Sequence, residues 1–209
     1  MHNINRLRRQ LSIGLAASPF VGKAFAQNRQ PDLAYVNALR KGNCVVLIRH
    51  AVTVPGTGDP PGMRLDDCST QRDLSDEGGA QSRRFGQWFR QYDLLPSRVR
   101  SSQWCRCLNT AKEAFSDKNF GAQLTIEPWT ALNSFFQGHG NRDRQLEQAM
   151  SEARAIALRK SFGQFEVWVT HQVTISALAN HYAAMGEMIV ATYDAPEKPL
   201  RVLASGLSF

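Results

Sequence analysis

Two histidines and two arginines in this sequence come shortly after runs of apolar residues, and their side chains suit phosphate chemistry. Arg49 and His50 follow one such run, His171 follows another, and Arg106 comes soon after a third. A guanidinium presents a planar pair of donors that matches two phosphate oxygens, so several arginines offset the charge of a phosphate monoester. A histidine with one free ring nitrogen is a nucleophile near neutral pH. The combination predicts phosphoryl transfer through a phosphohistidine.

The pattern of elements explains how these residues could meet. Continuous apolar runs rich in β-branched residues, such as 44–48 and 167–169, are typical of strands buried on both faces of a parallel sheet. Predicted strands alternate with predicted helices, which indicates an α/β fold, a three-layer α/β/α sandwich with a mostly parallel central sheet. In such sheets, ligands bind beyond the carboxyl ends of the strands. The other predicted strands are 98–101, 124–127, 188–190 and 201–203, and the predicted helices are 75–92, 102–115, 142–161 and 173–185, after a short helix within 27–43.

A long loop is predicted between the first strand and the helix that follows it. Residues 51–73 contain three prolines and three glycines, which interrupt both helices and strands. Loops of this length inside compact domains are usually functional. Arg72 lies near the end of the loop, where it could add a contact to a substrate or equally well be a surface ion-pair partner.

Four pieces of the sequence, in this order, resemble the histidine phosphatase superfamily, which includes cofactor-dependent phosphoglycerate mutases and acid phosphatases. The resemblance extends from about residue 44 to residue 205. It implies that His50 is the nucleophile, that Arg49 and Arg106 hold the phosphate, and that His171 stabilises the transferring group. It also implies a small phosphorylated substrate or a phosphoprotein as the partner, with neither a metal ion nor another cofactor. The pieces are Leu47-Ile48-Arg49-His50-Ala51, Leu74-Ser75-Asp76-Glu77-Gly78, Ser101-Ser102-Gln103-Trp104-Cys105-Arg106 with Thr110-Ala111, and Val169-Thr170-His171.

The sequence departs from this family at the acidic proton donor. Many members carry a glutamate in a Leu-Asn-Glu-like context, whereas here residues 131–134 read Ala-Leu-Asn-Ser. General acid catalysis contributes roughly 10²–10⁴-fold when the leaving group is poor. The departure therefore favours a substrate with a good leaving group, such as phosphohistidine or another phosphoramidate. Otherwise Glu127, Asp143 or Asp59 supplies the proton from a different position.

Each of these residues also has a structural interpretation. His50 or His171 alone is expected to be a hydrogen-bonded core histidine, and Arg106 alone a surface residue. Their joint occurrence favours a site, whereas His139 and His181 have no supporting motif and are expected to be exposed or structural. The alternative function is a non-catalytic module that binds phosphate or a phosphoprotein. His50 favours an enzyme, because a binding module gains little from a nucleophile among its donors.

The first 26 residues have the parts of an export signal. They contain four basic and no acidic residues, a modest apolar stretch at 11–21 and the cleavage-site pattern Ala24-Phe25-Ala26. The pair Arg8-Arg9 before this stretch is typical of a twin-arginine signal. We therefore predict a signal at 1–26 and a single periplasmic or secreted domain at 27–209. The alternative is an amphipathic first helix.

Charge and hydropathy exclude two classes of partner. The chain has a formal charge of +7, but four of its 25 basic residues lie in the first 26 positions. Residues 27–209 then carry 21 basic and 18 acidic residues, a formal charge of +3, and no recognised nucleic-acid motif. No run of 18 apolar residues occurs, so stable membrane insertion is not expected. The sequence makes no prediction of oligomeric state.

The four cysteines are interpreted in the light of export, because disulfides persist in oxidising compartments. We predict a disulfide between Cys68 and Cys107, with Cys44 as a small buried apolar residue. The alternative is four unpaired thiols, since a sequence alone does not fix connectivity. Zinc is not favoured, because the cysteines lack paired Cys-x-x-Cys spacing and have no histidine pair nearby.

Overall fold

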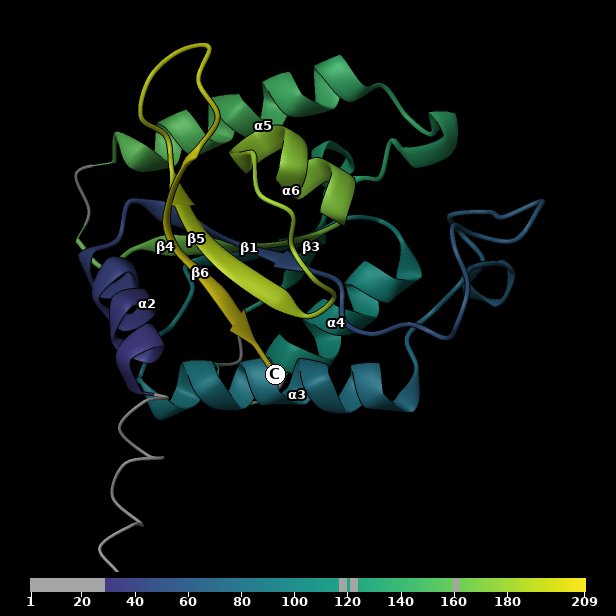
Figure 1. Ribbon diagram of the computed structural model, residues 1–209, viewed down its shortest axis with the longest axis horizontal. Coiled ribbons are helices and arrows are strands. Elements are labelled where there is room, and N and C mark those ends of the chain that lie inside the picture. The colour runs from purple at the N-terminus through teal and green to yellow at the C-terminus, as the bar shows by residue number, and fades with distance from the viewer. Residues whose placement is uncertain (1–28, 117–119, 121–123, 160–161) are drawn as a thin grey trace, which may run out of the picture.

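A six-stranded mixed sheet forms the centre of the structure, a computed structural model that describes residues 29–116, 120, 124–159 and 162–209 (Figure 1). The strand order is β3-β2-β4-β1-β5-β6, in which the first four strands are parallel and the last two antiparallel to their neighbours. The predicted signal at 1–26 lies outside the described residues. The strands are β1 (Cys44–Arg49), β2 (Arg98–Ser101), β3 (Ile126–Pro128), β4 (Phe165–Thr170), β5 (Glu187–Thr192) and β6 (Arg201–Ser208).

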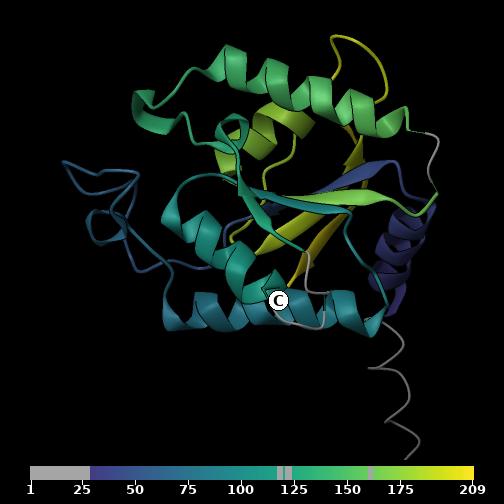
Figure 2. The same cartoon turned by 180° about the vertical axis from the view of Figure 1, so that it is seen from behind.

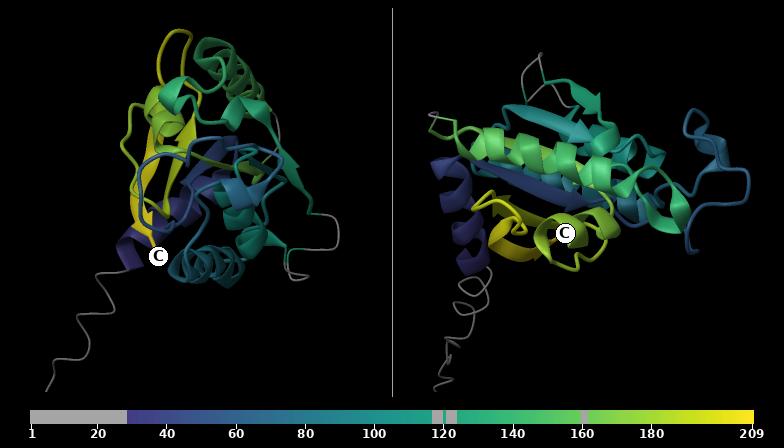
Figure 3. Two further views of the ribbon diagram at one scale, coloured as in Figure 1. Left: turned by 90° about the vertical axis from the view of Figure 1, so that its right-hand side faces the viewer. Right: turned by 90° about the horizontal axis from the view of Figure 1, so that it is seen from above.

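Helices cover both faces of this sheet, as Figures 2 and 3 show. Successive side chains of a strand point to opposite faces. Val46 and Ile48 of β1 accordingly pack with α2 (Arg29–Lys41), α3 (Asp76–Gln91) and α4 (Cys105–Phe115). Val45 and Leu47 pack with α5 (Arg142–Ala157) and α6 (Gln172–Ala179) on the other face. The predicted three-layer sandwich with a mostly parallel sheet is confirmed.

The start of α3 fixes the segment that follows β1. Ser75 caps this helix, because its hydroxyl accepts a hydrogen bond from the amide of Gly78 at 3.1 Å. A side chain at Gly78 would collide with the carbonyl oxygen of Val52, so only glycine allows the helix to approach the chain so closely here. On the other side, the amide of Ala51 donates to Oγ1 of Thr110 in α4 at 3.0 Å. The residues just after β1 are therefore held by two helices.

Several predicted boundaries differ from those in the structure. Helix α6 ends at Ala179, not at residue 185, because Asn180 takes a left-handed conformation with φ of 50° and terminates it. Strand β6 continues to Ser208, well past the predicted end at residue 203. Helix α5 ends at Ala157, and α4 begins only at Cys105, three residues later than expected.

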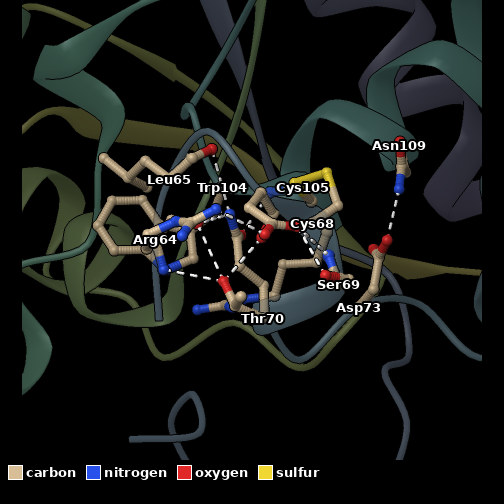
Figure 4. The surroundings of a disulfide bond; sticks show 12 residues. Arg64, Leu65, Cys68, Ser69, Thr70, Asp73, Trp104, Cys105 and Asn109 are labelled. Carbon is tan, nitrogen blue, oxygen red and sulfur yellow. Dashed lines mark hydrogen bonds and ion pairs between the residues drawn. A yellow bond between two sulfur atoms is a disulfide. The ribbon is translucent and has the colours of Figure 1, made fainter. Parts of the chain in front are cut away.

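The predicted Cys68–Cys107 disulfide is wrong, because the structure joins Cys68 to Cys105, with 5.6 Å between their Cα atoms (Figure 4). Cys105 is the first residue of α4 and meets the short helix η1 (Cys68–Thr70) of the long loop. Positions two apart in a helix point in nearly opposite directions. Cys107 is therefore buried against the sheet as a free thiol, and Cys44 is buried and free as expected.

Candidate active site

A cavity of about 340 Å³ opens at the carboxyl ends of β1 and β4, and we call it the histidine cavity. Strands β1 and β4 are neighbours, with Arg49 paired to Thr170, so His50 and His171 leave the sheet side by side. Their rings lie 5.6 Å apart, centroid to centroid. The structure brings together in this cavity all five residues expected to bind or attack phosphate, namely Arg49, His50, Arg72, Arg106 and His171.

His50 is buried, and its surroundings fix which ring nitrogen carries the proton. Its Nδ1 lies 2.9 Å from the carbonyl oxygen of Ala51, which can only accept, so Nδ1 is the protonated nitrogen. Burial, and then the charge of Arg106, lower the pKa of His50 to about 3. The ring is therefore neutral at physiological pH and carries a lone pair on Nε2, the form of histidine that attacks an electrophile.

Arg49 and Arg106 each leave one buried donor without a partner. Nη1 of Arg49 donates to the carbonyl oxygen of Ala183 at 2.9 Å, and Nη1 of Arg106 donates to Asp59 at 2.7 Å. The Nε atoms of both arginines are buried and make no hydrogen bond within the described residues. An unpaired buried donor costs about 1–3 kcal/mol, more when it is charged. An anion in the histidine cavity would satisfy both.

Arg72 and Asp59 organise the loop that covers the cavity. Arg72 donates from Nε to the carbonyl oxygen of Gly58 at 2.8 Å and from Nη1 to that of Gly56 at 3.0 Å. Arg72 is thus held by loop carbonyls while it also lines the cavity. The carboxylate of Asp59 accepts from Arg106, from the indole of Trp104 at 3.0 Å and from the amide of Arg72 at 3.1 Å.

None of the three acidic residues considered as proton donors is placed to carry a proton in this cavity. Burial raises the pKa of Asp59, but the hydrogen bonds from Arg106 and Trp104 outweigh it and hold that pKa below its usual value. Asp59 is therefore an ionised partner of Arg106. Glu127 lies on β3, 2.8 Å from Arg98, and does not line the cavity. Asp143 lies in the first turn of α5 with its side chain 89% exposed, also outside the cavity.

His171 is held by groups that the sequence analysis did not assign to the site. Its Nε2 lies 2.8 Å from the hydroxyl of Ser102, which in turn lies 3.2 Å from Oδ1 of Asn133. Burial, followed by the charge of Arg106, keeps the pKa of His171 well below its usual value, so this ring is also neutral. Ser102 belongs to the Ser101-Ser102 motif that carries the family resemblance. The only sequence signal at Asn133 was that the residue after it is not acidic.

His139 is a further residue of the cavity that sequence reasoning passed over. It lies in the turn before α5, and its ring packs edge-on against Trp104 with 5.7 Å between centroids. Trp104 in turn contacts His171, with 5.3 Å between ring centroids. No motif surrounds His139, so only the path of the loop reveals its place in the cavity.

The charge of the cavity suits an anion. Three guanidinium groups and one carboxylate line it, with two neutral histidines between them. Across the ranges that the structure describes, no three His, Cys, Asp or Glu side chains group so that they could hold a metal ion. No helix in the same ranges is long and apolar enough to cross a membrane.

Comparison of the sequence with protein-family models and with curated proteins finds no match. The structure, however, is similar to solved structures. A mycobacterial glucosyl-3-phosphoglycerate phosphatase aligns with a TM-score of 0.55 and 16% identity, over 77% of this chain and 97% of that chain. A candidate phosphohistidine phosphatase SixA from Agrobacterium tumefaciens aligns with a TM-score of 0.52 and 19% identity, over 79% and 98%. The protein histidine phosphatase SixA in complex with tungstate aligns with a TM-score of 0.50 and 13% identity, over 79% of this chain and 94% of that chain. These likenesses confirm the fold that the sequence resemblance implies.

Proposed function

We propose that this protein is a phosphatase of the histidine phosphatase type that forms a phosphohistidine on His50. One observation carries the proposal: a neutral histidine with Nε2 free shares a cavity with two arginines whose buried Nε donors lack partners among the described residues. The similarity in fold to phosphatases whose names specify phosphohistidine or glucosyl-3-phosphoglycerate supports it. The substrates are phosphomonoesters or phosphoramidates, including phosphohistidine.

The reaction has two steps. Nε2 of His50 attacks phosphorus, the bond from phosphorus to the leaving group breaks, and the leaving group takes up a proton. Water then attacks the phosphohistidine, the phosphorus–nitrogen bond breaks, and inorganic phosphate leaves. Arg49 and Arg106 match the phosphoryl oxygens in both steps, and neutral His171 lies beside the transferring group.

The alternative is a module that binds phosphate without turning it over. The variant His50→Asn separates the two functions, because the arginines supply most of the attraction for phosphate. We expect it to lose turnover of p-nitrophenyl phosphate by at least about 10³-fold while its Kd for inorganic phosphate changes only a few-fold. Steady-state kinetics and calorimetric titration measure the two quantities. Equal activity in His50→Asn and the parent protein would leave the binding module as the better description.

We also propose that the protein is exported and that the mature chain begins at Gln27. The Cys68–Cys105 disulfide supports this, because such bonds persist in oxidising compartments. N-terminal sequencing of the periplasmic protein is expected to begin at Gln27, and replacement of Arg8 and Arg9 by lysine is expected to block export. Export that continues in the lysine variant would indicate the general secretory route, and retention of the full-length chain in the cytosol would refute export.

A further inference from the structure

A second cavity, of about 540 Å³, adjoins the histidine cavity, and we call it the amide cavity. His139 lines both cavities, so it stands at their junction. The amide cavity lies between the loop after β1, which contributes Met63 and Leu65, and the segment that leads into α5. Figures 1 and 2 show that both stretches lie at the same end of the molecule. A substrate with its phosphate in the histidine cavity can therefore extend its remaining part past His139.

Gln145 gives the amide cavity a buried acceptor. Its Nε2 donates to the carbonyl oxygens of Asn133 at 2.8 Å and of Thr130 at 3.2 Å, which fixes the orientation of the amide. Its Oε1 is buried and has no partner within the described residues. A buried acceptor of this kind is satisfied by a ligand that brings a hydroxyl or an N–H group.

The rest of the lining suits a ligand with hydroxyl groups, and the guanidinium of Arg144 adds one positive charge to it. Asn141 and Gln148 add amides, which both donate and accept hydrogen bonds, while Met63, Leu65 and Trp104 form an apolar wall. Among the described residues, no carboxylate lines this cavity and Arg144 does, so a cationic ligand would find no ionic partner. A sugar ring combines hydroxyls with an apolar C–H face, and this lining matches both.

His139 is the group at the junction that could donate a proton to the leaving oxygen. His50 and His171 are neutral and Asp59 is ionised, so none of the three is a proton donor. Tyr182 is 75% exposed, lines only the histidine cavity, and interacts with Arg49. The ring of His139 makes no hydrogen bond in the described part of the chain and is free to do so with a ligand.

We propose, on the basis of the proposed function, that the amide cavity receives a hydroxyl-bearing leaving group, such as a sugar, and that His139 protonates it. When Nε2 of His50 forms its bond to phosphorus, the phosphorus–oxygen bond breaks and the leaving oxygen takes the proton from the His139 imidazolium. Neutral His139 then takes a proton from the water that attacks the phosphohistidine. The phosphorus–nitrogen bond breaks, phosphate leaves, and both histidines return to their starting states.

The first experiment fills the amide cavity without touching a catalytic group. Gln148 is an exposed residue of α5 that lines the cavity, so Gln148→Trp is expected to block it. Glu147→Trp, at the adjacent exposed position that does not line the cavity, is the matched control. The probes are hexose 1- and 6-phosphates, cyclohexylmethyl phosphate as a ring without hydroxyls, and phosphoramidate, whose leaving group is too small to reach the cavity.

We expect at least one hexose phosphate to exceed cyclohexylmethyl phosphate in kcat/KM by about tenfold or more. Gln148→Trp should lower kcat/KM for that hexose phosphate by about tenfold or more and leave phosphoramidate within about twofold. Glu147→Trp should change neither. Equal kcat/KM for the hexose phosphates and cyclohexylmethyl phosphate, or equal loss of all substrates in Gln148→Trp, would overturn the assignment of the cavity.

The second experiment tests His139 as a proton donor with the variant His139→Gln. We expect a loss of about 10²-fold or more for the preferred hexose phosphate and less than about threefold for p-nitrophenyl phosphate, whose leaving group needs no proton. An equal loss for both substrates would assign His139 a structural role.

These outcomes are separate from those that test the phosphatase itself. If the parent protein turns over neither phosphoramidate nor p-nitrophenyl phosphate, the proposed function fails. If it turns over both but the variants show no selective loss for hexose phosphates, the proposed function stands and this inference fails.

Discussion

The histidine cavity and the amide cavity are built from different kinds of structure. In the first, Arg49, His50 and His171 leave the ends of two paired central strands, and Arg106 lies in the first turn of α4. In the second, most of the lining comes from loops, with α5 contributing Arg144, Gln145 and Gln148. Residues at strand ends are fixed by the ladder of the sheet, whereas loops vary in length and path. The comparison indicates that strand ends position the two histidines that face the phosphate and that the loops determine what the phosphate is attached to.

The largest expected effect concerns the histidine cavity. Arg106→Ala removes both the unpartnered Nε and the partner of Asp59, so an ionised carboxylate would remain in the cavity. We expect kcat/KM for p-nitrophenyl phosphate to fall by about 10²–10³-fold, with weaker binding of inorganic phosphate as well. The double variant Arg106→Ala/Asp59→Asn is the control, since it removes the stranded charge and should recover part of the loss. A loss of less than about threefold in Arg106→Ala would contradict its role.

The next effect concerns the bond that ties the covering loop to α4. The Cys68–Cys105 disulfide closes a segment with a sequence separation of 37 residues, so its removal is expected to cost about 4 kcal/mol of unfolding free energy. Urea denaturation of the Cys68→Ser/Cys105→Ser variant measures this cost. Reductant should destabilise the parent protein by a similar amount and leave the variant unchanged. Peptide mapping that links Cys68 to Cys107 would contradict the pairing.

A third effect is a dependence of stability on pH that originates in the histidine cavity. The pKa of His50 is about 3 when folded and about 6.5 in an unfolded chain, so between these values the unfolded state binds more protons. Unfolding free energy should therefore rise with pH from about 3 to 6.5, by up to roughly 1.4 kcal/mol per pH unit for this one residue, and be flat above that range. Urea denaturation from pH 4 to 7 should give a smaller slope for His50→Asn. Equal slopes would indicate that His50 is not held neutral.

The sequence was sufficient to predict that His50 and His171 meet, because both residues directly follow strands. An apolar run ends, and the next residue must lie at the carboxyl edge of the sheet, as His50 and His171 do. To predict the disulfide pairing, one would instead need to know at which residue α4 begins. Because α4 begins at Cys105, that residue meets the loop and Cys107 faces the core. The position of His139 in the cavity is set by the path of a loop, and no periodic pattern in the sequence encodes that path.

The boundary error at α6 has a local cause that the sequence did contain. Asparagine is one of the few residues other than glycine that readily adopts the left-handed conformation at the end of a helix. Asn180 does so, and the chain then turns back so that the carbonyl oxygen of Ala183 can accept from Arg49. The early end of α6 thus contributes to the position of an arginine in the histidine cavity.

The most direct test of the central claim is the detection of phosphate on His50. The mature protein is mixed with phosphoramidate, quenched in alkali within one turnover, digested and examined by mass spectrometry. We predict an increase in mass of one phosphoryl group on the peptide that contains His50, and none in His50→Asn. Turnover of phosphoramidate with no phosphorylated His50 peptide in the quenched protein, or phosphorylation of the peptide that contains His171 in its place, would contradict the claim.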